Sequence, residues 1–329
     1  LTLVSLTACT AAAATEEDIQ ETRDAKPGGT LVVDVDFGSI EVLPGDDDKV
    51  VINAHRKIEA SSKEKEEEYL KAAPIRVTTE GDKVIVRATH KHESLGSQLW
   101  NLLGRHNTEG RYSIRVPANF NTDLDTDGGG ITASGLTGSI KADTSGGDLS
   151  FEKIHGDIHA DTSGGDIKVT TCEGKTHLDT SGGHIEVTDG RGDVSADTSG
   201  GNITVMNLAE DAKVDSSGGK LRLANISGKL HAETSGGAIS AILPGTISND
   251  IHLETSAGAI TVMTPPNAGL TIDAETGAGN VRSDLPMANV RSDDDSLNAT
   301  INGGGKNLVL RTGAGSIEIV SAEKETAQQ

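Results

Sequence analysis

The chain has 329 residues, of which 40 are glycine and only 6 are aromatic, so its core must be built from small and aliphatic side chains. A hydrophobic fraction of 34% excludes a disordered polyelectrolyte. The glycine content argues against long helices, because each glycine in a helix interior costs about 1 kcal/mol relative to alanine. The net charge of −21 excludes nucleic acid as a partner and disfavours direct docking on anionic lipid.

The first 14 residues are typical of the apolar part of a bacterial export signal, followed by a polar segment. The segment Leu6–Cys9 (LTAC) is similar to a lipobox, in which the cysteine becomes acylated and N-terminal. The alternative is ordinary signal cleavage after the alanines at 11–14, which leaves a soluble secreted protein. Both place the mature chain outside the cytoplasm, and the favoured form is a protein of the cell envelope, whether periplasmic, outer-membrane or surface, that is lipid-anchored at Cys9. No later segment approaches the ~20 apolar residues of a membrane helix, so lipid is the predicted membrane link.

Residues 15–29 are expected to be a linker and residues 30–120 an N-terminal α+β cap. The cap holds five of the six aromatic residues and lacks the repeat that follows, although DFGSIEV at 36–42 resembles one worn repeat. Capping of this kind protects the open end of a parallel sheet. The predicted elements are a helix from Ser61 to Ala73, with a capping box formed by Ser61 and Glu64 and a stop at Pro74, and strands at Ile75–Val77, Val84–Ala88 and Tyr112–Val116.

A short amphipathic helix is predicted on an excursion from the cap, because leucines recur at helical spacing beside the single tryptophan. Packing over the end of the repeat region is the favoured interpretation. The alternative is an exposed partner-binding element formed by Leu99, Trp100 and Leu103.

From residue 125 onward the sequence repeats with a period of 18. A Thr-Ser-Gly-Gly corner begins at Thr144 and recurs at Thr162, Thr180 and Thr198, and later corners follow with insertions of three residues. A fixed period this short indicates a solenoid. We therefore predict a β-solenoid over residues 121–320 and a disordered tail over residues 321–329.

Apolar positions within the repeat are spaced by nine residues and alternate with polar ones, which predicts two short strands per turn. The fold class is thus all-β, a parallel solenoid whose winding is expected to be right-handed. Its core should stack like on like, with a column of isoleucine and leucine facing a column of alanine. The paired glycines of each corner, such as Gly146 and Gly147, are expected to adopt positive φ.

The opening DFGSIEV, the lead-in YSIRVPANF at 112–120 and the tandem GDIxADTSGGDIxV units together resemble the bacterial "putative adhesin" family, a cell-envelope β-solenoid domain of unknown function. The resemblance covers residues 28–320. It implies an architecture but no activity, because the family has no established catalytic residues to carry over.

An acidic residue stands immediately before each corner, and stacked carboxylates repel by about 0.9 kcal/mol per adjacent pair even at the dielectric constant of water. One interpretation is Ca²⁺ bridging neighbouring turns; no other cofactor is expected. The favoured one is that each carboxylate accepts hydrogen bonds from the N–H groups of its corner. The residues concerned are Asp143, Asp161, Asp179, Asp197 and Asp215, with Asp125, Glu233, Glu254 and Glu275 at the two ends of the column.

An outward column two residues earlier contains four histidines, in which His159 with His177, and His231 with His252, could chelate a transition metal. Two imidazoles without a third ligand make a weak site, so a solvated surface row is favoured. The same applies to the cluster of His90, His92 and His106 in the cap.

The sequence favours a non-enzymatic, adhesin-like surface or scaffold protein, whose envelope protein or glycan partner it does not identify and whose rods could associate end to end. Nucleophilic catalysis lacks a motif, and Cys172 lies in a corner with no local reason for thiolate character. The alternative is a protein that binds or cleaves envelope polysaccharide. Against it, sugar sites use aromatic platforms, and Phe151 is the only aromatic residue after Phe120.

Overall fold

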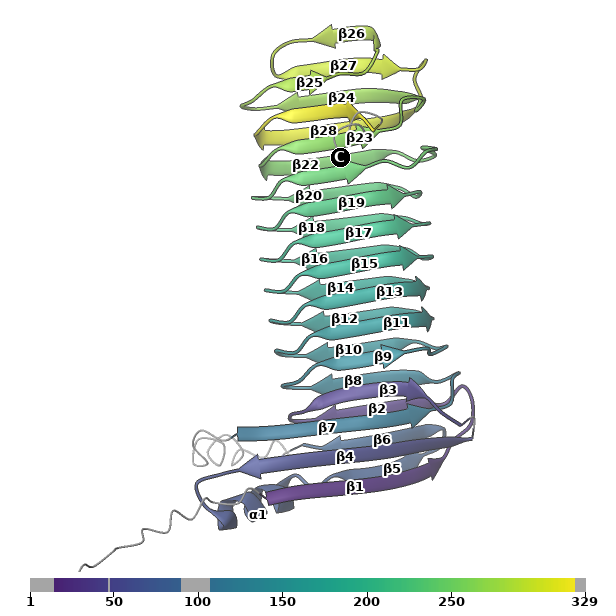
Figure 1. The fold of residues 1–329 in the computed structure, drawn as a ribbon, viewed down its shortest axis with the longest axis vertical. Helices are drawn as coiled ribbons and strands as arrows, with labels where there is room; N and C mark the ends of the chain where they lie inside the picture. Colours follow the sequence, from purple (N-terminus) through teal and green to yellow (C-terminus); the bar gives the residue numbers. More distant parts are fainter. Residues whose placement is uncertain (1–14, 47, 90–106, 323–329) are drawn as a thin grey trace, which may run out of the picture.

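The computed structural model describes residues 15–46, 48–89 and 107–322, which form a long rod of two facing β-sheets (Figure 1). We call them sheet A and sheet B. In spatial order, the strands of sheet A are β1 (Thr15–Asp24), β4 (Lys49–Glu59), β7 (Asn107–Val116), β3 (Ser39–Pro44), β9 (Ile131–Ser134), β11 (Leu149–His155), β13 (Ile167–Glu173), β15 (Ile185–Gly190), β17 (Ile203–Leu208), β19 (Leu221–Ile226), β21 (Ile239–Ile242), β23 (Ile260–Thr264), β29 (Ile317–Ser321) and β25 (Val281–Ser283).

Sheet B begins, at the same end of the rod, with a hairpin. In spatial order its strands are β5 (Arg76–Glu80), β6 (Lys83–Ala88), β2 (Thr30–Val35), β8 (Asn121–Thr126), β10 (Ile140–Thr144), β12 (Ile158–Thr162), β14 (Thr176–Thr180), β16 (Val194–Thr198), β18 (Ala212–Ser216), β20 (Leu230–Thr234), β22 (Ile251–Ala257), β28 (Lys306–Ala314), β24 (Leu270–Thr276), β27 (Ser296–Ile301) and β26 (Ala288–Ser292).

The middle of the rod confirms the predicted solenoid. Strands β8 to β23 alternate between the sheets, and each pairs in parallel with the strand one turn away. Ile140 lies opposite Ile158 in sheet B, and Leu149 lies opposite Ile167 in sheet A, so one turn is 18 residues and two strands. Leu230 lies opposite Ile251, which locates the first three-residue insertion between these strands.

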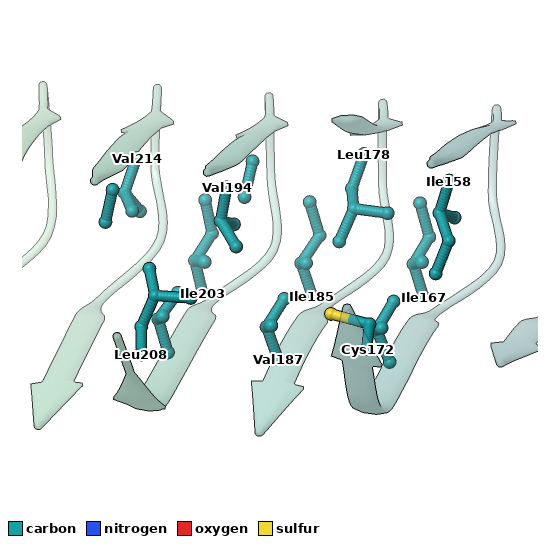
Figure 2. Close-up of a cluster of buried hydrophobic side chains, with 14 of the residues drawn as sticks. Ile158, Ile167, Cys172, Leu178, Ile185, Val187, Val194, Ile203, Leu208 and Val214 are labelled. Carbon is teal, nitrogen blue, oxygen red and sulfur yellow. The ribbon is translucent and has the colours of Figure 1, made fainter. Parts of the chain in front are cut away.

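The core lies between the sheets and stacks like on like (Figure 2). Ile167, Ile185 and Ile203 of sheet A are at most 1% exposed and face smaller or shorter columns of sheet B, such as Ala160 and Ala196. Phe151 points into this core and is also 1% exposed. The Cys172 thiol is buried beside Thr176, and burial raises its pKa, which agrees with the expected lack of thiolate character.

The paired glycines of the Thr-Ser-Gly-Gly motif do not adopt the predicted positive φ. Neither glycine of the pair at 146–147, nor of the pairs down to 236–237, has positive φ. The second glycine is required because a Cβ there would lie 1.6–2.0 Å from the carbonyl oxygen of the glycine one turn before. The threonine is buried; Thr198 donates to the Gly183 carbonyl at 3.0 Å and accepts from the N–H of Gly201 at 3.2 Å.

Left-handed backbone occurs instead at a bend in sheet A. The residues concerned have φ of 54–59° and follow the 18-residue period. Asparagine suits such a position, because its short polar side chain tolerates left-handed backbone. Two side-chain hydrogen bonds, Asn207 to Asp189 at 2.9 Å and Asn225 to Asn207 at 3.1 Å, link successive turns. The column is Lys153, Thr171, Asp189, Asn207 and Asn225.

The N-terminal end corrects two predicted boundaries. Residues 15–24 are not linker but strand β1, which pairs antiparallel with β4. The cap predicted over 30–120 also contains a complete solenoid turn, because β2 and β3 pair in parallel with β8 and β9. The degenerate repeat at 36–42 therefore belongs to the solenoid. The predicted β5–β6 hairpin and the lead-in strand β7 are confirmed.

The cap proper is held to β1 by buried charges. The Arg56 guanidinium of β4 is fully buried, bonds to Glu17 of β1 and donates to the Ala73 carbonyl at 2.8 Å. Glu66 of the helix is 1% exposed and accepts from the Thr15 hydroxyl at 2.5 Å, which is the main reason that its pKa is lowered. Helix α1 and β1 are thereby fixed to one another.

Helix α1 (Lys63–Ala72) is shorter than predicted and does not form the predicted capping box. Its N-cap is Ser62 rather than Ser61, and the Ser62 side chain makes no capping hydrogen bond. It ends before Pro74, as predicted. Among the described residues, no helix combines the length and apolarity needed to cross a bilayer.

At the C-terminal end the turns do not stack in chain order, an arrangement that the 18-residue period does not predict. Strands β28 and β29, the last turn along the chain, lie between the turn of β22 and β23 and the turn of β24 and β25. The antiparallel strands β27 and β26 then close sheet B at the tip (Figure 1). Thr312 lies opposite both Thr255 and Thr276, so the last turn of the chain separates two turns whose corners follow one another in the sequence.

Candidate functional site

The carboxylates before the corners form one continuous row on the outer face of sheet B. Register places each opposite the next on neighbouring parallel strands, a spacing of about 4.8 Å. The row begins one turn earlier than predicted, with Asp34, and all five aspartates predicted as a Ca²⁺ site lie within it. We call it the acidic ladder: Asp34, Asp125, Asp143, Asp161, Asp179, Asp197, Asp215, Glu233 and Glu254.

An arginine lies next to the acidic ladder at each of its two ends. Arg87 lies opposite Asp34, with its Nε 3.5 Å from the carboxylate. At the other end Arg311 of β28 lies between Glu254 and Glu275 and bonds to Asp273 at 2.5 Å. Glu275 is therefore separated from the ladder, contrary to prediction. The sequence did carry a signal, since Arg311 precedes Thr312 as the acids precede their own threonines.

Each carboxylate from Asp143 to Glu254 has a partner two residues earlier on its own strand, on the same outer face. Because the side chains at i and i+2 of a strand share a face, the repeat places the two columns side by side. The hydrogen-bonding or ion-pair distances are Lys141–Asp143 2.6 Å, His159–Asp161 3.1 Å, His177–Asp179 2.9 Å, Ser195–Asp197 3.4 Å, Lys213–Asp215 2.9 Å, His231–Glu233 2.8 Å and His252–Glu254 3.2 Å.

These pairs replace the predicted hydrogen bonds from the corner backbone. Throughout the described turns, the second glycine N–H of the corners from 144 to 237 bonds to a threonine or serine hydroxyl. The ladder carboxylates from Asp143 to Glu254 are therefore contacted by side chains of their own strands rather than by the N–H groups of the corners. The contact of Asp197 is the weakest of these, because its partner Ser195 is uncharged.

Partial burial and like charge raise the pKa values of three members of the ladder. Desolvation is the first cause for Asp125, Asp161 and Asp197, and the carboxylates of neighbouring turns add to it. In contrast, hydrogen bonds to Asp143 and Asp215 raise the pKa of Lys141 and Lys213. The ladder is therefore a surface on which further negative charge is disfavoured and positive charge is attracted.

The acidic ladder from Asp125 to Glu254 lines an open groove of about 830 Å³ that runs along the rod from Asp125 to Ser256. Threonines and the serines of the corners complete its lining. The serine column was not predicted as part of a site, although its 18-residue spacing is visible in the sequence. Such a groove offers carboxylates and hydroxyls in a repeating line, and Ca²⁺ binding there remains a prediction.

Other predicted site residues lie outside the described part of the chain. These are the proposed lipidation residue Cys9 and the proposed partner-binding residues Leu99, Trp100 and Leu103. The histidines at positions 90, 92 and 106 also lie there.

Sequence comparison matches residues 30–320 to the Toastrack family, DUF4097, and of the described residues that range leaves out only 15–29 and 321–322. The chain belongs to the Toastrack family. The match confirms the predicted kinship with a "putative adhesin" family of unknown function and a β-solenoid fold. Among curated proteins, none matches this Toastrack chain.

Three solved structures resemble the Toastrack chain at low identity. A "putative cell adhesion protein" from Clostridium sporogenes is 14% identical, with 93% of this chain and 100% of that chain covered and a TM-score of 0.19. A "putative adhesin" from Parabacteroides distasonis is 11% identical, with 93% and 97% covered and a TM-score of 0.41. A "putative adhesin" from Bacteroides fragilis is 12% identical, with 92% and 97% covered and a TM-score of 0.32.

Proposed function

We propose that this Toastrack protein is an exported, non-enzymatic protein of the cell envelope that uses the acidic ladder and its groove as an adhesive surface. The observation that carries the proposal is the unbroken row of nine carboxylates, eight of which line one groove. A row with a spacing of about 4.8 Å can engage many charges of one extended partner at once, so weak contacts add through multivalency.

The chemistry of the groove favours an extended polycation as that partner, such as a lysine-rich peptide or a polymer of unacetylated amino sugars. Among the described residues, only Asp143 and Asp215 of the ladder have a lysine as same-strand partner, and the whole chain carries a net charge of −21. Complementary charge also speeds association and suppresses anionic competitors.

The groove supports adhesion better than polysaccharide cleavage. Glycosidases place two carboxyl groups on either side of one sugar bond, whereas the ladder repeats one carboxylate without a distinct partner acid. Phe151 is the only aromatic residue beyond Phe120, and it is buried in the core, so the described solenoid offers no aromatic platform for a sugar ring.

Binding to immobilised polymers tests the proposal. Wild-type protein should bind a deacetylated amino-sugar polymer, and the triple variant Asp143→Asn, Asp179→Asn, Asp215→Asn should bind at least tenfold more weakly. A matched control neutralises three acids of sheet A, Glu152→Gln, Glu173→Gln and Glu186→Gln, and should bind as wild type does. Equal loss in both variants would refute a specific role for the groove.

Two further measurements test the remaining parts of the proposal. Release of reducing sugar ends from any bound polymer would contradict a non-enzymatic role. Mass spectrometry of the mature protein from bacterial envelopes should find an acylated Cys9, and recovery of the protein from the cytoplasm would overturn export.

A further inference from the structure

We infer that His231, Glu233 and His252 form a binding site for a first-row transition-metal dication such as Zn²⁺. The inference is independent of the proposed adhesive function. His231 of β20 and His252 of β22 lie opposite each other in register, and their rings are stacked with centroids 4.9 Å apart and planes 17° apart. The parallel strands thus hold two imidazoles side by side on the outer face.

A carboxylate completes the donor set. The Glu233 carboxylate lies 2.8 Å from His231 Nε2, and one donor atom from each of the three residues lies within 4.8 Å of the others. Two imidazoles and one carboxylate are ligands that Zn²⁺ uses, at about 2.0–2.2 Å each. Donors on one tetrahedral ion are therefore roughly 3.4 Å apart, so binding requires the two imidazoles to rotate out of their stacked arrangement, which side chains that are 34–48% exposed have room to do.

Neighbouring charges leave the cluster available to a cation. Glu254 lies 3.2 Å from His252 Nε2 and can orient that ring or supply a fourth donor. The nearest cations in register are engaged elsewhere: Lys213 with Asp215 at 2.9 Å, and Arg311 with Asp273 at 2.5 Å. Val309 follows His252 in the same outward column and carries no charge.

The chain contains a natural comparison. His159 and His177 are stacked in the same way, with centroids 5.0 Å apart and planes 5° apart, but their strands carry aspartates. Among the described residues, only the cluster with Glu233 brings three donor atoms within 4.8 Å. The extra methylene of glutamate lets the carboxylate reach both rings, so the pair at β12 and β14 should bind more weakly.

Calorimetric titration of untagged protein with ZnCl₂ tests the site, on a background with His90→Gln, His92→Gln and His106→Gln to remove the cap histidines. One tight site per chain is expected. His252→Gln and Glu233→Gln should each weaken it by about tenfold or more, whereas the matched control His177→Gln should leave it unchanged.

Circular dichroism of each variant without metal establishes that it is folded, and the substitutions are on the surface. The inference is overturned if the background protein binds no Zn²⁺, if Glu233→Gln binds as the background does, or if His177→Gln weakens binding as much as His252→Gln.

Discussion

Replacing Asp197 by asparagine should stabilise the protein at neutral pH. Asp197 lies between Asp179 and Asp215 on the neighbouring strands, and its own partner is the uncharged Ser195. Two carboxylates about 4.8 Å apart repel by about 0.9 kcal/mol in water, and two such neighbours give about 1.7 kcal/mol before screening. In 0.1 M salt, where the Debye length is about 10 Å, we expect a gain of about 1 kcal/mol in the free energy of unfolding.

The pH dependence has a definite sign. Burial and the adjacent carboxylates raise the pKa of Asp197 in the folded state. A raised carboxyl pKa contributes stability below the unfolded pKa of about 3.9, and this contribution is lost as pH rises through the folded value. Asparagine does not titrate, so the advantage of Asp197→Asn should be full at pH 7 and absent below about pH 3.

Urea unfolding followed by circular dichroism, at pH 7 and pH 3 in 0.1 M and 1 M NaCl, measures the effect. Ser195→Lys should give a gain of similar sign, because it supplies the missing cation, whereas Asp215→Asn forfeits the Lys213 pair and should gain less. A loss of stability in Asp197→Asn at pH 7, or a gain of equal size at pH 3 or in 1 M NaCl, would refute the electrostatic reasoning.

Three other substitutions test separate features by the same unfolding measurement. Gly201→Ala should lower the free energy of unfolding by about 3 kcal/mol, because its Cβ would lie 1.7 Å from the Gly183 carbonyl oxygen. The control Gly200→Ala, whose nearest contact is 3.6 Å, should stay within about 0.5 kcal/mol of wild type. Equal losses in the two variants would contradict the role assigned to the second glycine. Thr171→Asn should raise the free energy of unfolding by about 1 kcal/mol, because Thr171 is a β-branched residue in left-handed backbone at φ 57°. A destabilised variant would contradict this explanation. Glu17→Gln should lower the free energy of unfolding by about 3–5 kcal/mol, because it leaves the buried charge of Arg56 without its carboxylate. The exposed Glu16→Gln is the control and should not change stability. Unchanged stability in Glu17→Gln would show that β1 is held by other contacts.

The sequence predicts the shaft of the rod almost completely, because the buried positions repeat every 18 residues and each column is stacked on itself. Ile167 over Ile185 and Thr180 over Thr198 require no knowledge beyond the period. The row of acids before the corners is likewise visible, as is the histidine column beside it. What periodicity cannot supply is the third donor at Glu233, since its reach depends on side-chain conformation.

The two ends were predicted less well for a different reason. Strand β1 has a polar sequence with no buried face, and its place is set by pairing with β4 and by the Glu17–Arg56 contact. At the other end, nothing in the spacing between Thr276 and Thr312 tells which turn each will join. Stacking order in a solenoid is a tertiary property, and repeats of similar sequence are compatible with several orders.

The place of the last turn has a mechanical consequence. Strand β29 is held along both long edges, by β23 and by β25, and β28 is held by β22 and β24. A force applied to the chain beyond β29 therefore loads two rows of hydrogen bonds at once and along the strand axis, so the bonds must break together. In a solenoid whose final turn formed the tip, the same force would load only one row of hydrogen bonds. The C-terminal end thus has twice the hydrogen-bonded edge to resist extraction under tension, which suits the adhesive role proposed above.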